Sequence, residues 1–156
     1  MKITNRLNVT YVLMDPRRSD LIPDLRLNNR NDLVVKSAVD TRIAVRKTLI
    51  IPTGIKIITY PVFPVTSGNK TVDLHLEGAC ETIDSLEVEK GIVVVGPKVL
   101  TETYDEELRV AIRNDGDKIV AIRPGDPIAR VSFNFRPGIQ FNMINGDLVL
   151  KNQEGV

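Results

Sequence analysis

Apolar and polar residues alternate over short runs along most of the chain, and Gly, Pro, Asn or Asp separates the runs. In residues 71–76, Val72, Leu74 and Leu76 fall on one face of an extended segment, which leaves Asp73 and His75 on the other. No window longer than about ten residues holds a clean helical spacing of apolar positions. The pattern therefore predicts an all-β sandwich or barrel with little helix.

Several runs are specific enough to predict elements. Residues 2–12 read as a first strand, and residues 108–113 place Leu108, Val110 and Ile112 inward with arginines outward. A turn at 114–117 and a return strand at 119–122 are predicted after it. Asn145-Gly146 lies between two apolar runs, which predicts a C-terminal hairpin over 139–150.

Composition narrows the class of protein. With 156 residues, 42% hydrophobic and 26% charged, the chain has the size and make-up of a single soluble domain spanning 1–156. Its net charge of +1 argues against nucleic acid as the main partner. The single cysteine, Cys80, excludes an internal disulfide and fits a reducing compartment. No membrane span or signal peptide is expected, so the location predicted is the cytoplasm or a virion assembled there.

Two segments carry a family resemblance. Pro52-Thr53-Gly54 follows an apolar run, and Pro124-Gly125-Asp126 precedes Ile128-Ala129. Together with the order of strand, hairpin and Gly-Asp turn in 91–133, these segments resemble the dUTPase superfamily, to which the dCTP deaminases are related. The resemblance covers about residues 31–133. It implies a dUTPase-like distorted jelly roll or β-sandwich barrel, and a homotrimer with sites between chains.

The first and second motifs of that family are altered here. Asp32-Leu33 matches the end of the first motif, and it reads equally well as a strand entry that caps a turn. The second motif, an Arg-Ser pair that holds phosphates, is represented only by Ser85. No arginine stands beside Ser85, and Asp84 and Glu87 put negative charge where a triphosphate would sit.

The third motif forms the uracil pocket and carries the catalytic Asp in the family. Its counterpart contains Val99, Leu100 and Tyr104, with Thr101 where the Asp would stand. A threonine hydroxyl is no general base near neutral pH. The neighbouring Glu102 substitutes for the base only if the hairpin slips by one residue, because adjacent strand residues face opposite sides.

The fourth and fifth motifs depart as well. Arg130 replaces the family's glutamine, which leaves two interpretations open, contact with an anion or a salt bridge at a subunit surface. The Gly-rich fifth motif is missing, and the hairpin at 139–150 stands in its place. Val99, Leu100, Ser85, Tyr104 and Arg130 are thus the predicted remnants of a nucleotide pocket, with no metal ligand among them.

Arg17-Arg18, His75 and Cys80 each could take part in binding or catalysis, or could have only a structural role. Arg17-Arg18 either binds an acidic partner or is a pair of solvated loop residues. His75 is the only histidine, so a triad or metal cluster that needs two histidines is excluded. Cys80 and His75 could form a nucleophile pair, or they are an unreactive thiol and an exposed strand residue.

Two functional hypotheses follow from the resemblance and its departures. The first is a non-catalytic dUTPase-fold protein, a homotrimeric structural or binding unit of a viral or phage particle or assembly, with other protein subunits as further partners and no cofactor. The second is a divergent deoxynucleoside triphosphate diphosphatase of the dUTP type, in which Glu102, Tyr104, Ser85 and Arg130 act with Mg²⁺. The damaged motifs favour the first.

Overall fold

The computed structural model describes residues 9–26, 32–60, 62–136, 141–144 and 147–150. Strands dominate, and they run in the order β1 (Thr10–Leu13), β2 (Asp24–Arg26), β3 (Asp32–Lys36), β4 (Thr41–Ile43), β5 (Thr48–Pro52), β6 (Ile55–Thr59), β7 (Val62–Ser67) and β8 (Lys70–Glu81). After the helix α1 (Asp84–Lys90) come β9 (Ile92–Gly96), β10 (Arg109–Asn114), β11 (Val120–Ile122), β12 (Pro127–Arg136), β13 (Phe141–Ile144) and β14 (Asp147–Leu150). A 3-10 turn occupies Ser19–Leu21. The predicted all-β class is confirmed.

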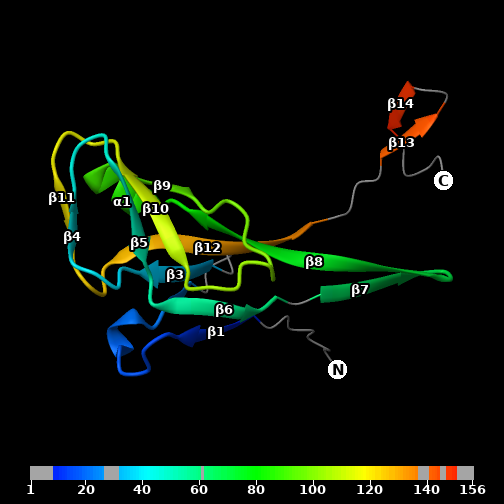
Figure 1. Ribbon diagram of the computed structural model, residues 1–156, viewed down its shortest axis with the longest axis horizontal. Helices are drawn as coiled ribbons and strands as arrows, with labels where there is room; N and C mark the ends of the chain where they lie inside the picture. Colours follow the sequence, from blue (N-terminus) through cyan, green and yellow to red (C-terminus); the bar gives the residue numbers. More distant parts are fainter. Residues whose placement is uncertain (1–8, 27–31, 61, 137–140, 145–146, 151–156) are drawn as a thin grey trace.

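All strand pairs are antiparallel, and they form curled sheets around one core (Figure 1). The largest sheet has the order β2-β3-β12-β8-β7, and a three-stranded sheet has the order β5-β10-β9. The pairs β1-β6, β11-β4 and β13-β14 complete the described sheets. Long-range pairing of this kind, rather than local helix, determines the architecture.

The core is built by alternation along the strands. In β10, Val110 and Ile112 are completely buried whereas Arg109 and Arg113 are exposed, as the sequence pattern predicts. The strands β3, β4, β5, β6, β9 and β12 add apolar residues to the same cluster, among them Val35, Ile43, Ile51, Ile55, Val94 and Val131. Burial of such side chains is the main favourable term in folding.

The Pro52-Thr53-Gly54 segment joins β5 to β6 and ties both to the chain before β10. The backbone N–H of Thr53 donates to the carbonyl of Leu108 at 3.1 Å, and its hydroxyl donates to the same oxygen at 2.7 Å. Gly54 has φ of +71°, a left-handed conformation that glycine adopts without steric cost. This bend is a structural feature with no reactive group.

Two sequence-based expectations about pairing are wrong. The return strand β11 does not pair with β10 but with β4, because β10 already has β5 and β9 on its two edges. The stretch 97–107 is a loop rather than a hairpin, with a single bridge between Leu100 and Gly78. Of the first predicted strand, residues 10–12 fall in β1, and residues 2–8 lie outside the described part of the chain.

The strands β7 and β8 extend together away from the body, as the right-hand side of Figure 1 shows. Pairs run from Val62 with His75 to Ser67 with Lys70, and β12 reaches along β8 only as far as His75. Every residue from 64 to 73 is exposed. We call residues 62–75 the arm.

Candidate functional site

Arg130 lies where residues from the first and fourth predicted motifs meet. Its guanidinium contacts Asp32 of β3 at 3.3 Å and Glu81 of β8 at 2.6 Å, and it donates to the carbonyl of Thr82 at 3.0 Å. The side chain is 15% exposed and that of Asp32 only 4%. Arg130 therefore holds β3, β12 and the end of β8 together on one face of the sheet.

The charge of this network is the opposite of what a phosphate site needs. One guanidinium faces two carboxylates, so the formal sum at Arg130, Asp32 and Glu81 is −1. Phosphate recognition relies on uncompensated Arg or Lys donors. Of the two interpretations of Arg130, this geometry corresponds to a salt bridge, formed within the chain. Asp32 begins β3 and serves as the buried partner of that arginine.

The loop before β10 carries the residues that stand for the third motif. Leu100 is completely buried, and it exchanges backbone hydrogen bonds of 2.6 and 2.8 Å with Gly78 of β8. Val99 beside it is 53% exposed. The hydroxyl of Thr101 forms a hydrogen bond of 2.7 Å with that of Thr103. Leu100 anchors the loop to β8, and the position of the expected base carries a hydroxyl that is already bonded to its neighbour.

Tyr104 folds back on its own loop. Its backbone N–H donates to the carbonyl of Thr101 at 2.9 Å, and its half-buried ring packs against the core. The hydroxyl lies 3.5 Å from the carbonyl of Glu107 and from the N–H of Arg109. Glu102 is exposed in the turn, and within the described chain it has no hydrogen bond or ion pair.

Ser85 lies in the first turn of α1, where it is exposed together with Asp84 and Glu87. Acidic groups at a helix N-terminus interact favourably with its dipole, and they repel an incoming anion. The helix begins without a side-chain cap and ends at Gly91, which adopts φ of +71°. The structure does not bring Ser85 into contact with the Arg130 network or with Tyr104.

Cys80 and His75 do not form a pair. They lie an odd number of residues apart on the regular strand β8, so their side chains project from opposite faces. Cys80 is completely buried, and burial raises the pKa of its thiol to about 12. A thiol in this state is not a nucleophile at neutral pH. The hypothesis of a Cys–His nucleophile is therefore wrong.

A second buried group lies near Cys80. Burial, followed by the nearby Cys80, Tyr104 and Glu102, raises the pKa of Tyr60 to about 12. Its hydroxyl is shielded from solvent and has no hydrogen-bond partner among the described residues. The surroundings of Cys80 and Tyr60 favour their neutral forms and offer no activated base.

Arg17 and Arg18 each form an ion pair with an aspartate two residues away. Arg17 pairs with Asp15 at 3.1 Å, and Arg18 pairs with Asp20 at 2.9 Å. The arginine partner lowers the pKa of each carboxyl group, through side-chain hydrogen bonds above all. The charges of the loop thus cancel locally, as expected if Arg17 and Arg18 are solvated loop residues and do not bind an acidic partner.

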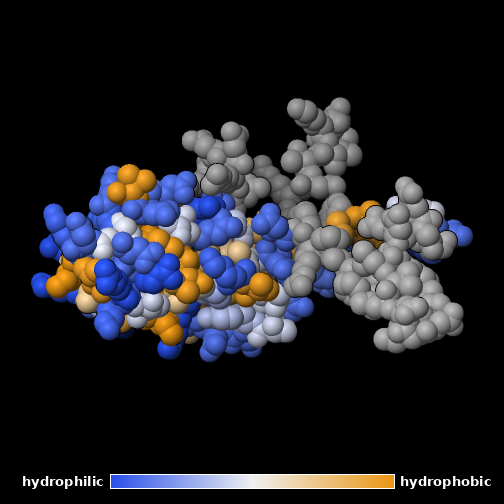
Figure 2. Space-filling model, turned by 90° about the horizontal axis from the view of Figure 1, so that it is seen from above, coloured by the Kyte–Doolittle hydropathy of each residue, from blue (hydrophilic) through white to orange (hydrophobic). Residues whose placement is uncertain are grey.

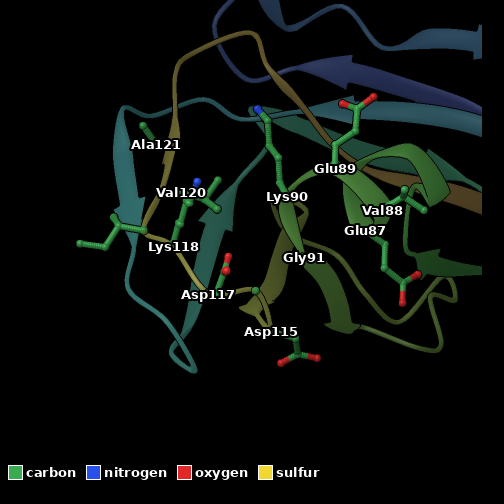
Figure 3. Close-up of a pocket in the computed structure, with 12 residues that line it drawn as sticks. Glu87, Val88, Glu89, Lys90, Gly91, Asp115, Asp117, Lys118, Val120 and Ala121 are labelled. Carbon is green, nitrogen blue, oxygen red and sulfur yellow. The ribbon is translucent and has the colours of Figure 1, made fainter.

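A groove of about 610 Å³ lies between α1 and the turn that follows β10 (Figure 3). Glu89 and Lys90 stand on the helix side of it, and Lys118, Val120 and Ala121 on the other. Charges of both signs line the groove without converging on one point. It shares no residue with the Arg130 network, and no motif in the sequence predicts it. The Arg130 network, in contrast, brings three charged groups together at one point.

The described residues contain neither a metal-binding cluster nor a membrane-spanning helix. Within them, no group of three or more His, Cys, Asp or Glu side chains is placed to hold a metal ion. No helix in that part of the chain has the length and apolar character to cross a bilayer. The surface shown in Figure 2 mixes hydrophilic and hydrophobic residues over the body of the molecule.

Comparison with known proteins identifies the fold. No family model matches the sequence, and no curated protein matches it. Among solved structures, the dUTPase from phage phi11 of S. aureus has a TM-score of 0.68 and 11% identity, over 89% of this chain and 97% of that one. The dUTPase of Staphylococcus bacteriophage 80alpha has a TM-score of 0.69 and 11% identity, over 95% and 94%. The EIAV dUTPase has a TM-score of 0.58 and 20% identity, over 88% and 100%.

The chain therefore has a dUTPase-like all-β fold, as the resemblance predicted. Identities of 10 to 20% establish the fold alone. The phage 80alpha dUTPase is described as controlling transfer of virulence genes by a proto-oncogenic G protein-like mechanism. Proteins of this fold thus include one with a described regulatory role.

Proposed function

We propose that this protein is a non-catalytic member of the dUTPase-like fold that acts as a homotrimeric structural or binding unit. The observation that carries the proposal is the state of Arg130. The arginine among the predicted pocket remnants, largely shielded from solvent, is bound to Asp32 and Glu81, with no net positive charge left for a triphosphate. Thr101 stands where a base is required and supplies none.

Other features support the same proposal. Leu100 is packed in the core, and Tyr104 is bonded within its own loop, so these two remnants serve the fold. The pair β13-β14 lies where a Gly-rich arm would follow the domain. Its expected turn, Asn145-Gly146, and residues 139–140 lie outside the described residues. In this proposal residues 1–156 form one domain whose C-terminal hairpin replaces a mobile lid.

The proposed setting is an assembly. Similar folds occur in dUTPases of staphylococcal phages and of EIAV, and a phage or viral particle, or a regulatory complex in the cytoplasm, is where such a unit would act. Its partners would be copies of itself and other protein subunits. A near-neutral chain with paired surface arginines supports protein rather than nucleic acid as the partner.

A divergent Mg²⁺-dependent diphosphatase of the dUTP type is the second candidate. One observation favours it: Glu102 is an exposed carboxylate beside Thr101 that has no hydrogen bond or ion pair within the described chain. In this alternative Glu102 acts as the base, and Tyr104, Ser85 and Arg130 complete a rearranged site with Mg²⁺. Arg130 would then have to exchange its contact with Glu81 for a phosphate.

Turnover separates the two candidates. The purified protein is incubated with Mg²⁺ and each of dUTP, dCTP, dATP, dGTP and dTTP, and release of diphosphate is followed beside the phage phi11 dUTPase as positive control. We expect no release above buffer and no heat of dUTP binding in calorimetry. Hydrolysis that disappears in Glu102→Gln would overturn the proposal and establish the alternative. Light scattering measures the mass of the assembly independently.

A further inference from the structure

The arm has no support from the rest of the described chain over most of its length. Its outer part, residues 64–73, is a two-stranded hairpin with exposed residues on both faces. A two-stranded hairpin is marginal in water unless it packs against something. The arm is thus an element that gains stability from a partner.

One face of the arm is apolar up to its tip, where the paired Ser67 and Lys70 lie on the same face. Val65 and Val72 are directly paired across the two strands, and they are 40% and 57% exposed. Leu74 lies on the same face of β8, two residues from Val72. The opposite face carries the directly paired Thr66 and Thr71, with Asp73 beyond them. A surface that is hydrophobic on one face only is typical of an interface.

The chemistry of the arm restricts what can cover it. From Val62 to Leu74 its charged side chains are Lys70 and Asp73, so the sum of charge is zero. Neither nucleic acid nor an anionic membrane is attracted to such a surface. Pro64, in the middle of the edge strand β7, has no backbone N–H, and proline on an edge discourages pairing with an added strand. The partner must therefore offer an apolar surface that is already folded.

This chain exposes such a surface. On the sheet β1-β6, Val12 is 40% exposed and Ile58 is 49% exposed. Val12 pairs with Lys56, which forms an ion pair with Asp105 at 2.7 Å. Ile58 lies two residues beyond Lys56, where the pairing shifts register, so the two apolar residues flank a charged pair. We call Val12 and Ile58 the β1-β6 patch. Met14, just after β1, is 53% exposed.

We propose that the arm packs its Val65–Val72 face on the β1-β6 patch of a second copy of this chain. Arm and patch are different surfaces, so the contact is heterologous and closes into a ring when the rotation allows it. Each subunit gives one arm and receives one. This inference rests on the proposed homotrimer and names one contact between its subunits.

The size of the arm limits what a single contact contributes. Its paired residues give a length of about 20 Å at roughly 3.4 Å each. One face of this length and about 10 Å width, roughly twice the spacing between paired strands, covers on the order of 200 Å². That is well below the roughly 800 Å² per partner of a standard interface, so one arm alone does not hold a dimer. A ring doubles the contact for each subunit and brings the bodies beside the arms together.

A pair of matched variants tests the arm. Val65→Asp with Val72→Asp places two charges on the apolar face, and Thr66→Asp with Thr71→Asp places two on the opposite face of the same hairpin. Both sites are exposed, and circular dichroism checks that each variant is folded. We expect light scattering to give three chains for the natural protein and for the Thr pair, and one chain for the Val pair.

A charge exchange tests the patch. Val12→Lys with Ile58→Lys is expected to give single chains as well, and combining these lysines with Val65→Asp and Val72→Asp in one chain is expected to restore the mass of three. If the Val pair stays trimeric while folded, the arm inference is overturned and the homotrimer stands. If the natural protein is a single chain, the homotrimer and the arm contact both fall. Failure of the combined variant to assemble would overturn the assignment of the patch.

Discussion

At the scale of single residues, the role of Arg130 in the structure differs most from the roles that the sequence allows. As a sequence position it replaces a glutamine and could contact an anion. In the fold it is enclosed by Asp32, Glu81 and the carbonyl of Thr82. Arginine suits this role because its planar group presents several donors at once. The result is a cross-link between strands at the position where the family resemblance implies a group that orients phosphate and water.

The Arg130 cross-link predicts an asymmetric response to mutation. Arg130→Met leaves Asp32 buried without its counter-charge, so we expect the free energy of unfolding to fall by about 3 kcal/mol. Asp32→Asn in the same chain removes the stranded charge and should recover part of the loss. Urea denaturation measures both variants. The exposed pair Arg113–Asp115 supplies the control, because Arg113→Met should leave stability unchanged. A double variant no more stable than Arg130→Met would contradict the argument.

Cys80 and Tyr60 predict a loss of stability in alkali. The pKa of Cys80 rises from 9.0 to about 12 in the fold, and that of Tyr60 from 10.0 to about 12. Between pH 9 and 12 the unfolded thiol ionises while the folded thiol stays protonated, so ionisation stabilises the unfolded state. We expect the free energy of unfolding to fall with pH in this window, by up to about 1.4 kcal/mol for each pH unit from Cys80 alone.

Urea titrations at several pH values measure this slope. Cys80→Ala with Tyr60→Phe should flatten the curve between pH 9 and 12, whatever the variant does to stability at pH 7. Tyr60→Phe alone should not destabilise the protein at pH 7, because the hydroxyl it removes is buried without a partner among the described residues. An unchanged alkaline slope in the double variant would show that other groups cause it.

At the scale of elements, the end of α1 is fixed by contact between two loops. Gly91 ends the helix with φ of +71°, and its N–H bonds the carbonyls of Leu86 and Glu87. A Cβ on Gly91 would lie 2.5 Å from the backbone nitrogen of Gly116. Gly116 in turn donates to the side chain of the buried Asn114, whose amide also binds the carbonyls of Ile43 and Lys118. The helix end, β4 and the turn after β10 are thus one unit.

Two glycines provide a matched test of this unit. Gly68, at the tip of the arm, has φ of +62°, and a Cβ added there would meet nothing within 4 Å, so Gly68→Ala should cost only the backbone strain, about 1 kcal/mol. Gly91→Ala carries the same strain together with the clash against Gly116, and we expect about 3 kcal/mol in all. Thermal unfolding followed by circular dichroism gives both values. Equal losses would mean that the two loops separate freely.

At the scale of the whole molecule, the proposed trimer links stability to concentration. Assembly stabilises the folded chains by mass action, so the melting temperature of the natural protein should rise with each tenfold increase in protein concentration. The Val65→Asp, Val72→Asp variant should melt at one temperature over the same range. Scanning calorimetry between about 5 and 500 μM follows both. A melting temperature independent of concentration in the natural protein would contradict the trimer.

Much of the fold was predictable because alternation is a local signal. Val110 and Ile112 point inward and Val72 shares a face with Leu74, both as the residue pattern indicates. The partner of β11 was not predictable. Pairing of β11 with β4 joins segments more than seventy residues apart, and the turn at 114–117 looks the same in sequence whichever partner the strand finds.

In the candidate site, too, some features follow from residue type and others only from the tertiary structure. Residue identity alone establishes that Thr101 offers no general base and that acids surround Ser85, because the type of side chain fixes which groups can carry a charge. The binding of Arg130 by Asp32 and Glu81 emerged only once the strands were placed in space. So did the projection of the arm from the body. Those facts depend on which strands lie side by side, and long-range pairing is set by the packing of the entire core rather than by any local run of residues.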